Sequence, residues 1–306
     1  MVLPLFVIAG PTAVGKSALG ISLAKRFGGV VLSCDSVQVY RAMDIGTAKV
    51  SAEERAMVTH FGLDLCEPDR PYDVKQFADH AAEVLLHSVG PVFCVGGSGF
   101  YLKMFYGPVY DSIAVSPAVR ERVRAIEKRD GLNGLLQELD SHGGGNLPID
   151  RKNPRRVARF LERTMESDVR PAILLEKFRK MKGSFAERKP YTLLLEGAGP
   201  DYEGTLRRRI EKQLTDGLVG ETEMLRQKGF EQNPSACGSV GYREALDLLD
   251  GRIGREELPE RILIRTRQLA RKQRTWLRHQ IAADVVLPPN GENFGMAADF
   301  VERRLF

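Results

Sequence analysis

The chain has 306 residues and a formal net charge of +5, with an ordinary globular composition. This length is typical of one large domain or two smaller ones. No apolar run is long enough to span a membrane, so we expect no membrane partner. The four cysteines are scattered and predict neither a zinc site nor a disulfide framework. Free thiols are typical of a reducing compartment, and we therefore expect a cytoplasmic protein. We also expect it to act as a monomer.

The first informative element is an apolar run, Leu5–Ala9, that predicts a buried strand. A Gly-x-x-x-x-Gly-Lys-Ser motif follows it and leads into a helical pattern, which is the context that a phosphate-binding loop requires. The loop comprises Gly10, Pro11, Thr12, Ala13, Val14, Gly15, Lys16 and Ser17. In such loops the backbone N–H groups surround a diphosphate, the lysine supplies a positive charge, and the serine hydroxyl is placed to bind Mg²⁺.

Further strands are predicted at 29–33 and 91–95, and a weaker one at 61–65. Strands that alternate with helical segments predict an α/β fold with a doubly wound parallel sheet, like that of P-loop nucleoside triphosphatases. Residues 112–189 are helical in character, and a strand pattern returns at 191–196. We therefore expect a core made of residues 1–111 and 190–306, with a helical insertion at 112–189. Long helices are expected at about 201–228 and 256–280.

Two polar groups follow predicted strands and are expected near the phosphate loop, because ligands bind at the carboxyl ends of parallel strands. Asp35 could accept a proton or hold Mg²⁺ through water, although it could also be a helix cap. Ser98 lies in a Gly-Gly-Ser turn that could bind a second anionic group or be only a tight turn. An acid that binds Mg²⁺ often ends this strand in triphosphatases, and its absence here argues against ATP hydrolysis.

Positive charge is concentrated in two segments. Residues 151–189 contain thirteen Lys and Arg against five Asp and Glu, and residues 261–278 contain seven Lys and Arg and no acid. This distribution favours a polyanionic partner such as nucleic acid, while solvated helix faces remain the alternative.

Several motifs together resemble the bacterial tRNA dimethylallyltransferase family. They are the phosphate loop, Asp-Ser-Val-Gln-Val-Tyr at 35–40, Met-Asp-Ile-Gly-Thr-Ala-Lys at 43–49, Val-Gly-Gly-Ser-Gly-Phe-Tyr-Leu at 95–102, Asn-Pro-Arg-Arg-Val-Ala-Arg at 153–159, Val-Gly-Tyr-Arg-Glu at 240–244, and a basic run at 266–278. The motifs occur in the family's order. The departures are Ser98 in place of a threonine, His60-Phe61 in place of paired histidines, and the lack of an Asp-Pro-x-x-Ala stretch in the insertion.

The resemblance implies transfer of a dimethylallyl group from dimethylallyl diphosphate to N6 of the adenosine 3′ of the anticodon in tRNA. It implies Asp35 as the general base, Lys16 and Mg²⁺ at the departing diphosphate, and Ser98 as a group that positions it. A further arginine is implied eight residues before a Gly-Leu-x-x-Glu signal, which selects Arg209 from the run 207–209.

The resemblance also implies contacts with the tRNA anticodon stem-loop. Gln38 is a candidate for reading the base, and Tyr242 and Trp276 are candidates for stacking, although Trp276 could be a core aromatic. The implied set is Asp35, Ser36, Val37, Gln38, Arg155, Arg156, Arg159, Gly241, Tyr242, Arg243, Arg271, Lys272, Gln273, Trp276 and Arg278.

Two other classes of function remain open. An adenylate isopentenyltransferase or a nucleotide kinase would use the same scaffold but has no need of two basic segments. A non-catalytic RNA-binding module would have no need of Lys16 and Asp35 at adjacent strand ends.

Overall fold

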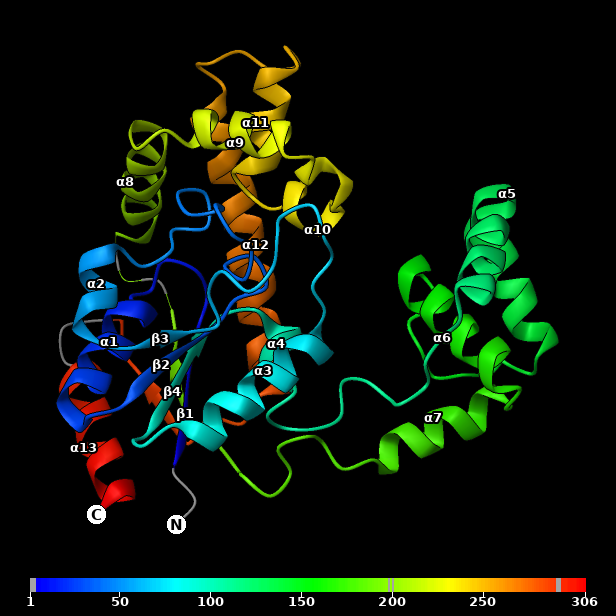
Figure 1. The fold of residues 1–306 in the computed structure, drawn as a ribbon, viewed down its shortest axis with the longest axis horizontal. Helices are drawn as coiled ribbons and strands as arrows, with labels where there is room; N and C mark the ends of the chain where they lie inside the picture. The colour runs from blue at the N-terminus through cyan, green and yellow to red at the C-terminus, as the bar shows by residue number, and fades with distance from the viewer. Residues whose placement is uncertain (1–3, 198, 200, 290–292) are drawn as a thin grey trace. The chain divides into compact units, whose positions relative to one another are not determined.

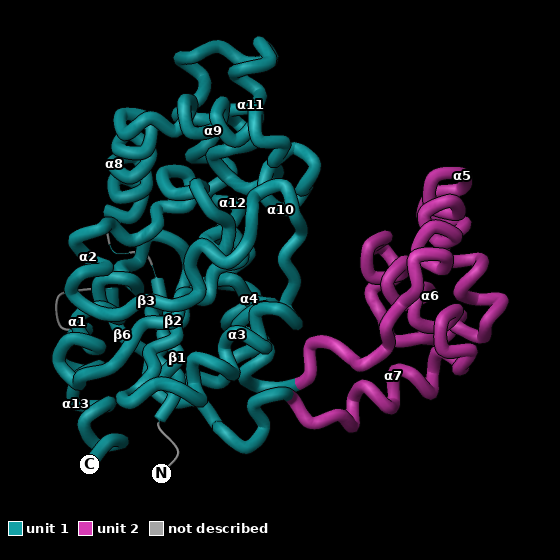
Figure 2. Tube along the Cα trace, viewed as in Figure 1, with its two compact units in different colours: residues 1–107, 184–306 teal, residues 108–183 magenta. Residues whose placement is uncertain are grey.

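The computed structural model describes residues 4–197, 199, 201–289 and 293–306, and the chain divides into two compact units (Figure 2). Residues 1–107 and 184–306 form the α/β unit, and residues 108–183 form the helical unit. The sequence placed these limits at 112 and 189. Asp111 pairs with Arg163 at 2.7 Å inside the helical unit, whereas Phe185 packs on Phe105 at a centroid distance of 4.9 Å inside the α/β unit.

Within the described residues, six parallel strands form one sheet, in the order β3-β2-β4-β1-β5-β6 (Figure 1). The strands are β1 (Leu5–Ala9), β2 (Val30–Cys34), β3 (His60–Phe61), β4 (Val92–Gly96), β5 (Tyr191–Leu195) and β6 (Val285–Leu287). The neighbouring strands β1 and β4 are far apart in sequence, as a doubly wound sheet requires. The expected α/β fold with a parallel sheet is confirmed.

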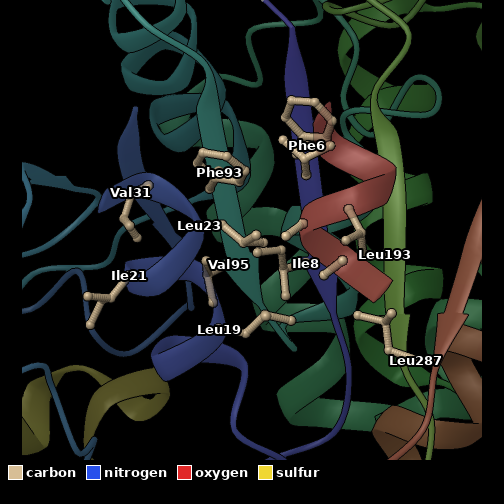
Figure 3. Packing of buried hydrophobic residues seen from close by; sticks show 14 of the residues in the cluster. Phe6, Ile8, Leu19, Ile21, Leu23, Val31, Phe93, Val95, Leu193 and Leu287 are labelled. Carbon is tan, nitrogen blue, oxygen red and sulfur yellow. The ribbon is translucent and has the colours of Figure 1, made fainter. Parts of the chain in front are cut away.

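Alternate residues of the strands pack against α1 (Lys16–Phe27) and α13 (Asn293–Leu305) on one face of the sheet (Figure 3). The period of two places Phe6 and Ile8 of β1 in this cluster. The α/β unit also contains α3 (Val74–His87) and α4 (Gly99–Lys103), where Phe77 stacks on Tyr101 at 4.6 Å.

Three sequence-based elements differ from the structure. The strand expected at 61–65 ends at Phe61, because Gly62 and Asp64 have positive φ angles of 79° and 56°. The helix expected at 201–228 is two helices, α8 (Tyr202–Thr215) and α9 (Leu218–Gln227), separated at Gly217 with φ 103°. The edge strand β6 was not predicted, because three residues carry little periodic signal.

A helical layer completes the α/β unit. The long helix α12 (Leu258–Gln280) contacts α4, α8 and α11 (Tyr242–Leu249), and α9 contacts α8 and α11. The short elements are α2 (Ala52–Met57), α10 (Pro234–Cys237) and a 3₁₀ turn at Phe230–Gln232. This layer brings α8 and α12 to the cavity that Thr12 and Lys16 of the phosphate loop line.

The helical unit contains α5 (Pro117–Ser141), α6 (Pro154–Ser167) and α7 (Pro171–Lys180). It has its own core, which includes Val123, Leu135, Leu139, Val157 and Leu161. A positive φ of 62° at Gly131 interrupts α5, which is therefore two helices joined at a kink. Among the described residues, no helix of either unit is long and apolar enough to cross a bilayer.

Candidate active site

The phosphate loop connects β1 to α1 in the left-handed conformations that such a loop requires. Ala13 has φ 60°, and Gly15, at the N-cap of α1, has φ 86°. Lys16 folds back so that its Nζ donates a hydrogen bond to the Pro11 carbonyl. The side chain of Ser17 is exposed at the first turn of α1. Free N–H groups at a helix N-terminus and a nearby ammonium make a binding site for an anion.

Two cavities lie at this edge of the sheet. The first, of about 210 Å³, is lined by the phosphate loop and by apolar residues of β2, β4 and the segment after β3. The second, of about 410 Å³, is lined by α8, α12, Ser235 of α10 and the segment 238–240. Both are lined by Thr12, Lys16, Asp35, Thr47, Gly97 and Arg209. The candidate site therefore consists of two adjoining cavities that share these six lining residues.

Three charged groups meet at the junction of the cavities. Burial lowers the pKa of Lys16 to about 8, although Asp35 opposes the shift, and Arg209 lowers the pKa further. Burial also lowers the pKa of Arg209, again against the effect of Asp35. Two cations held close together inside the protein favour a bound polyanion, because they repel one another without one.

The structure distinguishes Arg209 from its two neighbours in the arginine run. Arg207 is exposed and pairs with Glu203 and Glu260, both at 3.0 Å. Arg208 is exposed and pairs with Asp201 at 2.8 Å. Arg209 alone of the three lines the cavities, because a single step along a helix turns a side chain by about 100°.

The loop after β2 is held by Ser98. The Asp35 carboxylate accepts a hydrogen bond from the Val37 N–H at 2.9 Å, which fixes a local turn. The Ser36 N–H donates to Ser98 Oγ at 3.0 Å, and the two serine hydroxyls are 3.3 Å apart. Ser98 lines the second cavity. Its expected contact with a diphosphate stays a prediction, while its contact with the Asp35 loop is observed.

Sequence reasoning missed the anchor of the loop that carries Thr47. Glu221 of α9 is buried and accepts hydrogen bonds from the N–H groups of Asp44, Ile45 and Gly46, at 2.8–3.1 Å. Gln213 of α8 donates to the Ile45 and Gly46 carbonyls, both at 2.9 Å. The signal that could have found Glu221 is an acid inside an apolar helical pattern, since a buried carboxylate needs several donors.

Two family profiles match the chain. The profile described as IPP transferase matches residues 38–280, and that described as isopentenyl transferase matches residues 3–64. A tRNA dimethylallyltransferase of Opitutus terrae is 39% identical over 90% of this chain and 90% of its own length. One of Myxococcus xanthus is 34% identical over 93% and 92%.

The chain belongs to the IPP transferase family.

Solved structures agree with this family assignment. The full-length tRNA isopentenylpyrophosphate transferase of Bacillus halodurans is similar with a TM-score of 0.68 and 29% identity, covering 99% of this chain and 96% of the other. A eukaryotic dimethylallyltransferase acting on tRNA has a TM-score of 0.79 at 23% identity, covering 98% and 80%, which shows the shared fold.

In this IPP transferase, the prediction that Tyr242 stacks on an RNA base is wrong. Tyr242 is 0% exposed, and its hydroxyl donates to Glu221 at 2.6 Å. Its ring covers Gly46, where an added Cβ would be 2.4 Å from the ring. A residue with no accessible surface cannot stack on a base, so Tyr242 holds the loop instead. The neighbouring Gly241 is also buried, whereas Arg243 is exposed.

Gln38 and Gln273 are also engaged within the protein. Gln38 accepts from Ser33 Oγ at 2.8 Å and donates to the Thr47 and Ala48 carbonyls at 3.2 and 3.4 Å. Both ends of the Gln273 amide have protein partners, described below. Their contacts with RNA stay predictions. In this structure the Gln38 amide joins β2 to the loop at 47–48, and the Gln273 amide joins Thr12 to Gly97.

The arginines and the lysine predicted to contact RNA are exposed. On α12 of this family member, Arg271, Lys272 and Arg278 are exposed, and Trp276 is half-buried over Gly99, where an added Cβ would be 2.5 Å from the indole. In the helical unit, Arg155, Arg156 and Arg159 are exposed on α6. Asn153 caps this helix by accepting from the Arg156 N–H at 3.2 Å, and Val157 lies in the core.

Replacing Tyr242 with phenylalanine should destabilise the protein by about 1–3 kcal/mol, because it removes a hydroxyl from a buried carboxylate. Burial and the neighbouring Glu221 raise the pKa of Tyr242 strongly, so the hydroxyl stays protonated and donates at all ordinary pH values. Urea unfolding measures the effect. An unchanged midpoint at an unchanged slope would contradict the anchoring role of this hydrogen bond.

Proposed function

We propose that this chain transfers the dimethylallyl group of dimethylallyl diphosphate to N6 of the adenosine 3′ of the anticodon in tRNA. The observation that carries the proposal is the meeting of two cavities at Lys16, Asp35 and Arg209, in a chain that belongs to the IPP transferase family. The first cavity, with the phosphate loop, suits a diphosphate donor. The second, larger cavity suits the acceptor base, which must leave the RNA stack to reach the donor.

The reaction breaks the allylic C–O bond and forms a bond from the same carbon to N6. The diphosphate leaves with the electron pair of the C–O bond, and the backbone N–H groups of the loop, Lys16 and Arg209 stabilise its charge. The amine is a weak nucleophile, because its lone pair is delocalised into the ring. Asp35 accepts the N6 proton as the C–N bond forms, which keeps positive charge from building up on the amine.

Mg²⁺ is the expected cofactor. Mg²⁺ is commonly bound by one or two protein oxygens together with phosphate oxygens. The exposed hydroxyl of Ser17, at the first cavity, fits this pattern, and no cluster of three acidic, histidine or cysteine ligands occurs among the described residues. When bound with the donor, the ion neutralises charge on the departing diphosphate.

One experiment separates the candidate activities. The full chain is incubated with dimethylallyl diphosphate and either tRNA or AMP, and the product that gains mass is identified. Prenylated tRNA supports the proposal. Prenylated AMP would instead show an adenylate isopentenyltransferase, and robust turnover of ATP would show a kinase or an ATPase.

Affinity for the diphosphate should fall as the pH rises through about 8, the pKa of Lys16. The anion favours the charged ammonium, and at pH 9 only about a tenth of Lys16 in the free enzyme is protonated. Lys16→Arg is the matched control, because a guanidinium stays charged over this range. Calorimetry with inorganic diphosphate at pH 7, 8 and 9 measures the effect. If the diphosphate affinity of the parent changes with pH as little as that of the arginine variant, this role for Lys16 is excluded.

Binding of tRNA should weaken steeply with salt, with a log–log slope of about −0.7 to −0.9 per phosphate neutralised. Replacing Arg155, Arg156 and Arg159 with alanine should lower tRNA affinity and flatten this slope, while donor affinity stays the same. The matched control is the replacement of Arg122, Arg124 and Arg129 with alanine. These arginines are exposed on α5 of the same unit, so their replacement removes the same amount of charge.

Equal effects of the two triple replacements would show only a general effect of charge. Normal tRNA binding by the α6 variant at every salt concentration would mean that the helical unit does not bind the RNA through this helix.

A further inference from the structure

The side-chain amide of Gln273 lies between the phosphate loop and the turn that follows β4. Its Oε1 accepts a hydrogen bond from the Thr12 N–H at 2.9 Å, and its Nε2 donates to the Gly97 carbonyl at 3.1 Å. An added Cβ at Gly97 would be 2.7 Å from Nε2 and 2.8 Å from the Gly10 carbonyl, so a glycine is needed for this close approach. One amide therefore joins two segments at the carboxyl ends of β1 and β4.

A second contact holds the same residue of the loop. The hydroxyl of Tyr202, at the start of α8, donates to the Thr12 carbonyl at 3.0 Å. The guanidinium of Arg274 lies over the Tyr202 ring, 5.7 Å from its centroid. Two consecutive residues of α12 thus hold Thr12. Gln273 contacts it directly, and Arg274 packs on the tyrosine that contacts it. The Thr12 N–H, used by Gln273, is not available to an anion in this arrangement.

The position of Gln273 on α12 differs from that of its basic neighbours. Arg271 and Lys272 are exposed, whereas Gln273 is half-buried. Lys272 and Gln273 both line the second cavity. A contact with RNA would require at least one of its two amide hydrogen bonds to be shared or broken.

We propose that Gln273 is a positioning residue for the phosphate loop, which aligns the loop for the diphosphate through Thr12 and fixes the Gly97 turn. This inference rests on one part of the proposed function, namely that the phosphate loop binds the diphosphate of the donor. A binding loop whose N–H groups are held in place before the anion arrives binds it more tightly than one that must be ordered on binding. The amide serves both partners, because it accepts from an N–H and donates to a carbonyl at once.

The test uses the full chain, inorganic diphosphate and no RNA. Gln273→Leu removes both hydrogen bonds, and Gln273→Glu keeps the acceptor for Thr12 but places a negative charge beside the Gly97 carbonyl. Gln273→Leu should bind diphosphate about tenfold more weakly, the effect of two lost hydrogen bonds of ordinary strength. Gln273→Glu should also bind diphosphate more weakly, because it loses the donor to the Gly97 carbonyl and adds a negative charge near the anion. In the transfer assay the donor KM should rise by a similar factor, while kcat and tRNA affinity change by less than about twofold.

Gln280→Leu is the matched control, because Gln280 is an exposed glutamine at the end of the same helix, and it accepts a 3.4 Å hydrogen bond from Lys103. It should leave diphosphate affinity unchanged. If the Gln273 variants bind diphosphate like the parent but lose tRNA affinity, Gln273 contacts RNA and the proposal is overturned. If neither affinity changes, the residue has no positioning role. A parent protein that binds diphosphate but transfers nothing would overturn the proposed function and leave this inference standing.

Discussion

Replacing Asp35 with alanine should lower the rate of transfer to tRNA by about 10²–10⁴, the usual effect of losing a general base. Asp35 is the acid that lines both cavities, and its neighbours at the junction, Lys16 and Arg209, are cations. Without it, the N6 proton has no acceptor at the point where the carbon–nitrogen bond forms. Single-turnover transfer with the donor bound in excess measures this step directly.

Binding of diphosphate is the control for Asp35→Ala, and it should stay largely intact. Asp35 raises the pKa of Lys16, so its removal leaves Lys16 protonated over a narrower range of pH. The comparison therefore belongs well below pH 8, so that the lower pKa of Lys16 in the variant does not by itself reduce binding. Asp35→Asn preserves the shape and the acceptor for the Val37 N–H, and it should be as impaired as the alanine variant. Activity within a few-fold of the parent in both variants would exclude Asp35 as the base.

The second large effect is expected at Arg209. Arg209→Ala should lower transfer by about 10²–10³, the usual effect of removing one group that stabilises charge in a transition state. The guanidinium lines both cavities beside Lys16, where the leaving diphosphate gains charge as the allylic bond breaks. Steady-state kinetics with saturating tRNA and donor measure the effect on kcat.

Arg208→Ala is the matched control for Arg209→Ala, since it removes the same charge one residue away on α8. Arg208 is exposed and paired with Asp201, and such surface pairs contribute little. Its transfer rate should stay within about twofold of the parent. The reverse result, a strong effect at Arg208 and a weak one at Arg209, would show that the arginine of the site was assigned to the wrong position.

The sequence alone predicted the parts of the site that depend on local pattern. The phosphate loop is recognisable because its glycines, lysine and serine are contiguous and lie between a strand and a helix. Strands β1, β2, β4 and β5 were found within a residue or so, because buried parallel strands are continuous apolar runs. The α/β class and the family followed from these elements and from motifs in a fixed order.

The contacts between distant segments were decided only by the tertiary structure. Tyr242 and Gln273 are both polar residues in motifs predicted to contact RNA, yet one is buried against Gly46 and the other joins Thr12 to Gly97. The edge strand β6 is a strand because β5 supplies its partners, and Arg209 differs from Arg208 only by its angle on α8. Burial and hydrogen-bond partners belong to pairs of segments, such as Thr12 and Gln273, which are 261 residues apart, and no local pattern encodes them.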